Sequence, residues 1–446
     1  MKKLLAIALA MAMLLSLLAG CSGGKSEGEA AASADGKVTI TMVESLTSPE
    51  RTATLQSIID KYEAANPNVH VELISPPLEN ADAKISQMLM SGKGVDIVEV
   101  RDQTISQYAN NGWLADLTPY VDKWEHKGTL SDATKISMYQ QDGEHAFLVP
   151  SGFYQRCLYY REDVLKEAGI EVPTTWEGLL EAGAKLTDPA NNKFGYAFRG
   201  GASGYQYADT AMWAWIGVDK LAHPDAGYYL KDGNGATIFT LPEAKEALLF
   251  HKELYKQASP SDSIAWAFSE MVQGFVGGTC AFLIQDAEVI ATCSADMAEG
   301  TWNTAPFPAG PSGEAVFPNG YGGWGMTSFS ANPDATADFL LFLSNPENNT
   351  LYAANHAMVP IHTNASELSD AFSSGYFACY AEMAQEPTVY RYATQPQMYQ
   401  AFAAYKTEAD AMYQKFLTDE ISVDELLKWL DDYWTQAYAD EGQLWK

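Results

Sequence analysis

The sequence predicts an α/β protein with more than one domain, and two observations carry this prediction. Strand-like and helix-like segments alternate between residues 37 and 100 in the order strand, helix, strand, helix, strand. This order favours parallel strands joined by right-handed crossovers. About 410 residues follow the first 36, and a chain of that length exceeds one hydrophobic core and favours two domains.

The first elements are defined by local signals. A β-branched run, Lys37–Val43, predicts the first strand. A helix is expected to begin at Ser48, because this capping hydroxyl precedes Pro49 and an acidic residue. The apolar positions of this helix follow the spacing of one helix face: Leu55, Ile58, Ile59 and Tyr62.

The same alternation continues with a strand at Val69–Ile74, a helix around residues 85–89 and a strand at 95–100. Ligands of open α/β sheets gather at the carboxyl ends of the strands. The loops that follow the first and third strands, Glu44–Ser48 and Arg101–Thr104, are therefore candidate cleft loops.

The middle of the chain contains a second α/β region, and the last third, from about Asp334, is predicted to be mostly helical. Strands are expected at residues 147–150, 157–160, 194–198 and 280–285. Helices are expected at 162–168, from 174 onward and at 267–275.

The first 36 residues are predicted to be a targeting segment and a linker. Two lysines precede the apolar run Leu4–Leu18, which is too short for a comfortable bilayer span and suits a secretory signal. The run ends in Leu18-Ala19-Gly20-Cys21, which resembles a bacterial lipobox. We therefore expect a signal peptide at 1–20, lipidation of Cys21 and a flexible tether at 21–36, so that the membrane is contacted by a lipid anchor only.

The composition of the chain disfavours several classes of binding partner. The formal net charge is −29, which disfavours nucleic acid and anionic lipid surfaces, and also a large anionic ligand. No phosphate-binding, serine-hydrolase or zinc-protease motif is present, and no cysteine or histidine spacing suits a metal. The expectation is a protein without catalytic residues, metal or cofactor. Cys280 and Cys293 either pair or remain free thiols.

Several segments together resemble the family 1 extracellular solute-binding proteins. The clearest block combines Leu148–Phe153, Leu158–Asp163, Ala168-Gly169-Ile170 and Pro173–Glu177. Arg161-Glu162 replaces the Asn-Lys pair that is usual in the family's turn. The resemblance extends in order over nearly the whole mature chain.

This resemblance implies a two-lobed periplasmic-binding-protein-like fold of type II, with a hinge of about three crossing segments and an α-helical C-terminal part. The crossings are expected near Pro150, Met297 and Ala331. The implied division is a first N-lobe part, a first C-lobe part, an N-lobe return and a helical C-lobe part: 37–150, 151–297, 298–330 and 331–446.

The resemblance also implies the extracytoplasmic binding component of an ABC importer, acting as a monomer and delivering a sugar, oligosaccharide or polyol to permease subunits. Sugar sites combine aromatic faces with polar groups. Arg199, which follows Phe198, and Asp286 resemble the polyol-binding branch, while mono- and oligosaccharides remain open. The candidate ligand-binding residues are Glu44, Arg101, Asp102, Tyr154, Arg199, Trp213, Trp215, Asp286, Tyr321 and Trp324.

Three other functions compete with this interpretation. A secreted glycoside hydrolase needs two carboxylates beside the scissile bond, and the 57 acidic residues include enough candidates. A ferric-ion-binding protein would use adjacent tyrosines such as Tyr159-Tyr160 or Tyr228-Tyr229. A receptor-type binding protein would signal without feeding a transporter.

Overall fold

A computed structural model describes five stretches of the chain, and the expected signal peptide, Cys21 and tether lie outside them. Tyr228 is likewise outside the described residues. Within the described stretches, no helix has both the length and the apolar character that crossing a bilayer requires. The described residues are 37–77, 80–222, 229–231, 236–397 and 399–442.

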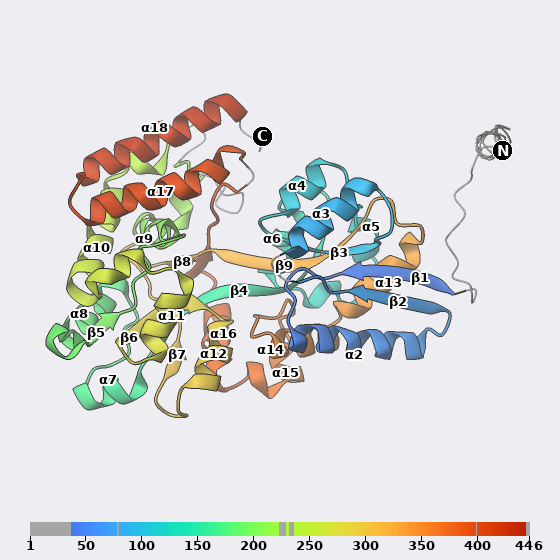
Figure 1. Cartoon of the computed structure of the whole chain (residues 1–446), viewed down its shortest axis with the longest axis horizontal. Helices are drawn as coiled ribbons and strands as arrows, with labels where there is room; N and C mark the ends of the chain where they lie inside the picture. Colours follow the sequence, from blue (N-terminus) through green and yellow to red (C-terminus); the bar gives the residue numbers. More distant parts are fainter. Residues whose placement is uncertain (1–36, 78–79, 223–228, 232–235, 398, 443–446) are drawn as a thin grey trace, which may run out of the picture.

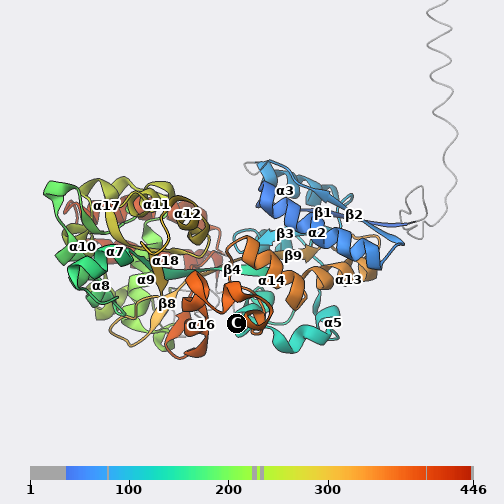
Figure 2. The same ribbon diagram turned by 90° about the horizontal axis from the view of Figure 1, so that it is seen from below.

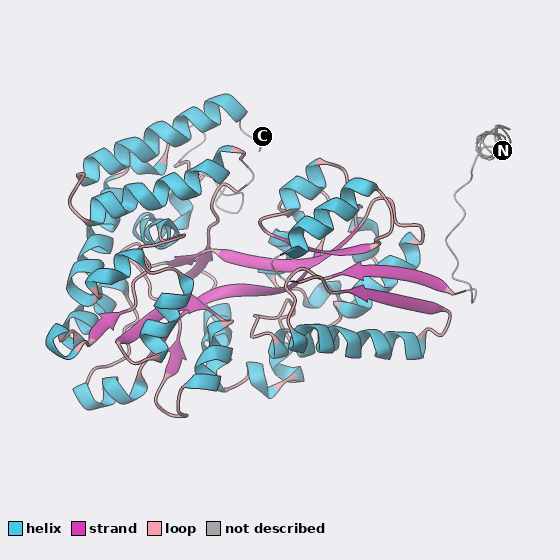
Figure 3. Ribbon diagram, in the orientation of Figure 1, coloured by secondary structure: helices cyan, strands magenta, loops and turns pink. Residues whose placement is uncertain are grey.

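Two lobes share one sheet. Figures 1 and 2 show the lobes side by side, with strands β4 (Val149–Tyr160) and β9 (Asn319–Met326) running through both. The strand order is β2-β1-β3-β9-β4-β6-β5, with β7 also paired to β4. The magenta strands in Figure 3 accordingly form a central layer that cyan helices surround. The expected two-lobed α/β fold is confirmed.

The N-lobe contains the predicted alternation of parallel strands and helices, in which β1 pairs with both β2 and β3. Ser48 caps the first helix by accepting a hydrogen bond from the Arg51 amide. The predicted apolar stripe of that helix is buried against the sheet. The elements are β1 (Val38–Val43), α2 (Pro49–Ala65), β2 (Val69–Ile74), α3 (Ala81–Ser91) and β3 (Ile97–Arg101).

Short helices complete the N-lobe and supply part of its cleft wall. They lie between β3 and β4, and Figure 1 shows α4 and α6 near the inner ends of β3 and β9. These helices are α4 (Ile105–Asn110), α5 (Thr118–Val121), the 3₁₀ helix η3 (Glu125–Thr129) and α6 (Asp132–Tyr139).

The C-lobe is built around the second half of β4, where β6 and β7 pair with it antiparallel and β5 extends the sheet beside β6. Its strands are β5 (Phe194–Tyr196), β6 (Cys280–Asp286) and β7 (Asn303–Ala305), with a separate pair, β8 (Ala315–Phe317) and β10 (Tyr390–Tyr392). Its helices before β7 are α7 (Glu162–Ala168), α8 (Trp176–Leu186), α9 (Tyr205–Ile216), α10 (Pro242–Ala258), α11 (Phe268–Val276) and α12 (Val289–Asp296).

The last third is helical, as predicted, but it is divided between the lobes. Helices α13 (Pro333–Leu343) and α14 (Pro346–Asn355) pack on α2 in the N-lobe, and α15 (Ala365–Leu368) packs on α14. The chain then returns to the C-lobe, where α16 packs on β7 and α17 packs on α9 and α10. These later helices are α16 (Ala378–Gln385), α17 (Ala401–Leu417) and α18 (Val423–Glu441).

Two of the expected crossings lie elsewhere. The N-lobe return expected over 298–330 begins later, at β9, because 303–305 still pairs with the C-lobe half of β4. The crossing expected near Met297 therefore lies near Pro318, between β8 and β9, and the one expected near Ala331 lies between α15 and α16. The segment 331–446 is thus not wholly C-lobe, because an amphipathic helix pattern does not reveal which sheet the helix covers.

Two further local expectations differ from the structure. The strands expected at 147–150 and 157–160 form one continuous strand, β4. The glycine-rich segment around Tyr321, which is not among the expected strands, is strand β9. A Cβ atom at Gly323 would lie 2.6 Å from the Val149 carbonyl oxygen, so glycine there permits close approach of β4 and β9.

Candidate functional site

A cavity of about 270 Å³ lies between the lobes and is lined by both of them. Its N-lobe walls come from the loops after β1 and β3, and its C-lobe walls come from β4, the end of β6 and the start of α9. The segment Tyr392–Gln397, which begins at the last residue of β10, supplies a further wall through Thr394, Gln395 and Gln397. The lining residues are Leu46, Arg101, Asp102, Gln103, Tyr154, Arg156, Gln206, Asp286, Glu288, Pro318, Gly320, Tyr321, Thr394, Gln395 and Gln397.

The loop after β3 contributes two residues expected from the sequence, Arg101 and Asp102. Arg101 forms an ion pair with Asp82, so its charge is already compensated. Asp102 accepts a hydrogen bond from the Gln103 amide at 2.9 Å. Burial raises the pKa of the Asp102 carboxyl to about 6, which makes this carboxylate an unusually strong hydrogen-bond acceptor for a ligand that displaces the proton.

The loop after β1 is held from beneath by a buried acid that sequence reasoning missed. Glu99, which is 1% exposed, accepts hydrogen bonds from the amides of Ser45 and Leu46 at 2.6 and 2.9 Å. Arg51 neutralises it at 2.8 Å and also donates to the Tyr154 hydroxyl at 3.3 Å. This network positions Leu46 and Tyr154 at the cavity wall.

Glu44, expected to be a ligand residue in the same loop, does not line the cavity. It is completely buried and accepts a hydrogen bond from the Thr52 hydroxyl. Burial is the largest influence on its carboxyl and raises its pKa. Its place at a strand end suggested a cleft residue, but the side chain turns toward α2 and away from the C-lobe.

The C-lobe face is dominated by Arg156 and Asp286, which are paired across β4 and β6. Their Nε and Oδ1 atoms lie 3.7 Å apart. Arg156 also donates to the Gln206 amide oxygen at 2.9 Å and lies 4.3 Å from the centre of the Tyr207 ring. Burial raises the pKa of Asp286, and the arginine charge opposes that rise.

Glu288 follows Asp286 by two residues and adds a second C-lobe carboxyl to the cavity. Its side chain is exposed, yet desolvation by the cleft walls raises its pKa to about 7, and the charge of Asp286 adds to the effect. Nothing in the local sequence distinguishes Glu288 from the many solvated acids of this chain.

Arg199 was expected at the site but does not line the cavity. Its Nε donates to the Ala202 carbonyl oxygen at 2.8 Å, which ties the arginine to its own turn. The guanidinium charge still reaches Asp286, whose pKa it lowers. Arg199 therefore acts on the site through another residue.

The three tryptophans expected as ring platforms are core residues. Trp213 and Trp324 are each 1% exposed and Trp215 is 7% exposed. Trp215 packs on Phe250 with ring centres 4.6 Å apart, and Trp324 packs edge-on against Tyr352. Helix α9 is buried on nearly every side, so its tryptophans pack within the lobe.

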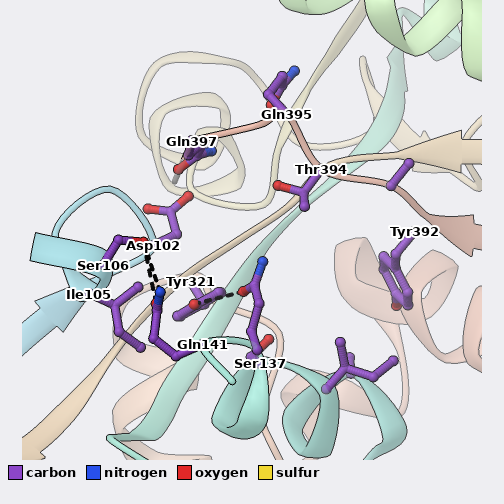
Figure 4. Close-up of a pocket in the computed structure, with 14 residues that line it drawn as sticks. Asp102, Ile105, Ser106, Ser137, Gln141, Tyr321, Tyr392, Thr394, Gln395 and Gln397 are labelled. Carbon is purple, nitrogen blue, oxygen red and sulfur yellow. Dashed lines mark hydrogen bonds between the residues drawn. The ribbon is translucent and has the colours of Figure 1, made fainter. Parts of the chain in front are cut away.

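Tyr321 and the segment Tyr392–Gln397 join the two lobes across the cavity. Tyr321 lies on β9, and its hydroxyl donates to the Gln140 amide oxygen at 2.9 Å. Figure 4 shows the segment passing close to Asp102, with Gln397 beside that carboxyl. The sequence contains no motif at Thr394, Gln395 or Gln397, so these lining residues were missed.

The described residues contain no cluster of three or more histidine, cysteine or acidic side chains suited to a metal ion. Tyr159 is buried and donates to the Asp286 carbonyl oxygen at 2.7 Å. Cys280 and Cys293, whose pairing was left open, are both buried free thiols. The functional groups that line the cavity are therefore carboxylates, amides, hydroxyls and one buried guanidinium, a set suited to reversible hydrogen bonding.

Comparisons with known proteins agree with this geometry. Residues 47–350, more than half of the chain, match the model of the family described as bacterial extracellular solute-binding protein. A putative ABC transporter periplasmic-binding protein of Escherichia coli K12 is 24% identical over 289 residues. That alignment covers 62% of this chain and 61% of the relative, so it spans less than two thirds of the relative's length.

Solved structures show the same fold. A cyclic α-maltosyl-1,6-maltose-binding protein from Arthrobacter globiformis is 21% identical with a TM-score of 0.73, covering 91% of this chain and 100% of that one. An ABC transporter solute-binding protein from Agrobacterium radiobacter K84, solved with ribitol, is 18% identical with a TM-score of 0.67 over 90% and 98% of the chains. Because residues 47–350 match the family model, the chain belongs to the bacterial extracellular solute-binding proteins.

Proposed function

We propose that this protein is the substrate-binding component of an ABC importer and that it captures a sugar or sugar alcohol in the cavity between its lobes. The observation that carries the proposal is the two-sided lining: Asp102 belongs to the N-lobe, while Asp286 and Glu288 belong to the C-lobe. A ligand stabilises the closed arrangement of two lobes only if it contacts both of them.

The polar character of the cavity supports a polyhydroxy ligand. Carboxylates accept hydrogen bonds from hydroxyl groups, and such charge-assisted bonds are stronger than neutral ones. The guanidinium of Arg156 and the amide of Gln206 supply donors and acceptors on the opposite side. Both arginines in the lining already face carboxylates, Asp82 and Asp286, so the described lining residues leave no uncompensated cation for an anionic ligand.

Five residues expected from the sequence belong to the proposed ligand contacts, and six missed residues join them. The expected residues are Arg101, Asp102, Tyr154, Asp286 and Tyr321. The others are Arg156, Gln206, Glu288, Thr394, Gln395 and Gln397. Among the described residues, the cavity lining contains tyrosines and no tryptophan, so hydrogen bonds contribute more to recognition here than stacking on large rings.

The ligands of similar proteins of known structure support the same class of ligand. Ribitol is the ligand of one structural neighbour, and a cyclic maltose derivative names another. Lobe closure by hinge motion about β4, β9 and the α15–α16 connection would present the loaded form to permease subunits. Lipidation of Cys21 would keep the protein at the outer side of the membrane.

A ligand screen by thermal shift and calorimetry tests this function. The purified protein is titrated with monosaccharides, oligosaccharides and sugar alcohols. A ligand present at 100 times its dissociation constant adds about 2.7 kcal/mol of stability, which shifts the melting temperature by a few degrees. Asp286→Asn should weaken binding at least tenfold. If peptides or metal ions shift the transition and no carbohydrate does, the proposal is wrong.

A further inference from the structure

A second, smaller chamber adjoins the cavity between the lobes. Five residues line both spaces, so they form the boundary between them: Asp102, Tyr321, Thr394, Gln395 and Gln397. The remaining walls of this side chamber come from helices α4 and α6 of the N-lobe and from Tyr392 and Ala393. Figure 4 shows Ile105 and Tyr321 among the residues that line this space. A ligand that passes this boundary would extend from the main cavity into the side chamber.

The two spaces differ in charge. The main cavity contains Asp102, Asp286 and Glu288 together with two arginines. Asp102, on the shared boundary, is the one charged residue among the described residues that line the side chamber. Apart from this boundary carboxyl, the side chamber provides no ionic partner for a ligand.

Beyond the boundary, most polar side chains of the side chamber already form hydrogen bonds, whereas the buried Gln395 Nε2 and Gln397 Oε1 on the boundary have no partner among the described residues. The Tyr321 hydroxyl donates to Gln140, and the Gln141 amide donates to the Ser106 hydroxyl at 3.1 Å. These pairs are drawn as dashed lines in Figure 4. The Tyr392 hydroxyl accepts a hydrogen bond from Gln155 at 2.7 Å. Hydroxyl groups of a ligand would have to compete with these bonds, whereas an apolar group would leave them intact.

Beside these polar groups, the side chamber presents aliphatic surface. Ile105 and Ala133 are buried in its wall, and Ile136 is 39% exposed. Among the large apolar side chains that the structure leaves most exposed, Ile136 alone lines one of these two spaces. An exposed isoleucine at the wall of a binding cavity is a ready partner for an apolar group.

Size restricts the occupant. The side chamber has a volume of about 40 Å³, against about 270 Å³ for the main cavity. One water needs at least roughly 10–15 Å³ on this measure, so the chamber accommodates roughly three non-hydrogen atoms. That space admits a methyl or short alkyl group and excludes a second sugar ring.

We propose that the side chamber is an apolar subsite, and that the preferred ligand is a polyhydroxy compound with a short alkyl end, such as a 6-deoxy sugar or an O-methyl sugar. The inference rests on the proposed carbohydrate-binding function. The hydroxyl-rich body of the ligand occupies the main cavity between Asp102 and Asp286, and its alkyl end contacts Ile105, Ala133 and Ile136.

Matched ligand pairs test the subsite. Calorimetry on the full protein compares L-fucose with L-galactose, L-rhamnose with L-mannose, and methyl glucoside with glucose. At least one pair should favour the methyl-bearing member by about fourfold or more, the factor expected for burying one methyl group. Equal affinities within every pair that binds would overturn the subsite and leave the proposed function intact.

Variants test whether the preference for methyl-bearing ligands depends on the side chamber. Ala133→Leu fills the side chamber and should abolish the preference for the methyl-bearing member of the pair. Ile136→Asn changes an exposed side chain and should reduce the preference without unfolding the protein. Leu249→Asn, at a residue 43% exposed on α10, is the matched control and should retain it. A preference that survives both Ala133→Leu and Ile136→Asn contradicts the subsite, and failure of every carbohydrate to bind removes both proposals.

Discussion

Arg156 and Asp286 face each other across β4 and β6, with Nε and Oδ1 3.7 Å apart, on the C-lobe wall of the cavity. Arg156 is 3% exposed and is also held by Gln206 and the Tyr207 ring. The pair therefore links two strands and places opposite charges together on the C-lobe wall of the cavity.

Removing the arginine should destabilise the protein. Arg156→Met leaves Asp286 largely desolvated without its partner, and we expect the free energy of unfolding to fall by about 2–3 kcal/mol. This is below the 3–5 kcal/mol typical of fully buried pairs, because the Asp286 side chain is 24% exposed. Urea denaturation measures the loss, and Arg156→Met with Asp286→Asn should recover much of it. No recovery would show that the pair is not coupled.

Stability should fall as pH rises from about 4 to about 7. Asp209 on α9 is fully buried and accepts a hydrogen bond from the Tyr229 hydroxyl at 2.5 Å. Burial raises its pKa to about 7, so over this range the unfolded chain loses a proton that the folded chain retains. Asp209→Asn should flatten the dependence of the unfolding free energy on pH. An unchanged slope in the variant would contradict this assignment.

Ligand affinity should rise with pH over a similar range. Hydroxyl groups that donate to Asp102 and Glu288 require the ionised carboxylates, whose pKa values without ligand are about 6 and about 7. Binding should therefore release protons, and the dissociation constant should be lower at pH 8 than at pH 5.5. Calorimetry in buffers of different ionisation enthalpy measures the protons released. Glu288→Gln should reduce their number, and proton uptake would show that the carboxyls act as donors.

The buried tryptophans should matter for stability and not for affinity. Trp213→Phe and Trp324→Phe keep an aromatic ring in each core position, so ligand affinity is expected to stay within about twofold. Trp324→Ala should cost about 3–5 kcal/mol of unfolding free energy. A tenfold loss of affinity in either phenylalanine variant, with stability retained, would show that the replaced tryptophan contributes to ligand binding.

The lipid anchor is testable in cells. Cys21→Ser removes the only thiol in the lipobox-like segment, and the protein should move from the membrane fraction to the soluble extracytoplasmic fraction. Metabolic labelling with a radioactive fatty acid should mark the native protein and not the variant. Labelling of the variant would place the acyl group on another residue.

Local signals were sufficient for the elements at the start of the mature chain. Ser48 caps the predicted helix, and its apolar stripe packs on the predicted parallel strands. The cleft loop after β3 was also predictable, because strand direction alone determines which end of the sheet receives Arg101 and Asp102. These inferences succeed because capping, periodicity and crossover handedness act over short stretches of chain.

The rest of the site depends on contacts between distant segments. Gln397 reaches Asp102 across almost 300 residues of chain, and no local pattern marks it or Gln395 as a lining residue. The prediction that the tryptophans bind the ligand was wrong for a related reason. The same aromatic ring can belong to a core or to a binding face, and what packs on it decides which. Helices α13 and α14 likewise joined the N-lobe only through their contacts with α2.

The sequence by itself determined the α/β class, the first alternating unit, the family and the ends of strands where a ligand would bind. Tertiary structure alone decided which residues face the cavity, which acids lie opposite one another, and that a small side chamber adjoins the cavity. The physical reason is that periodicity and capping are properties of neighbouring residues, whereas desolvation, ion pairing and cavity shape arise only when remote segments pack together.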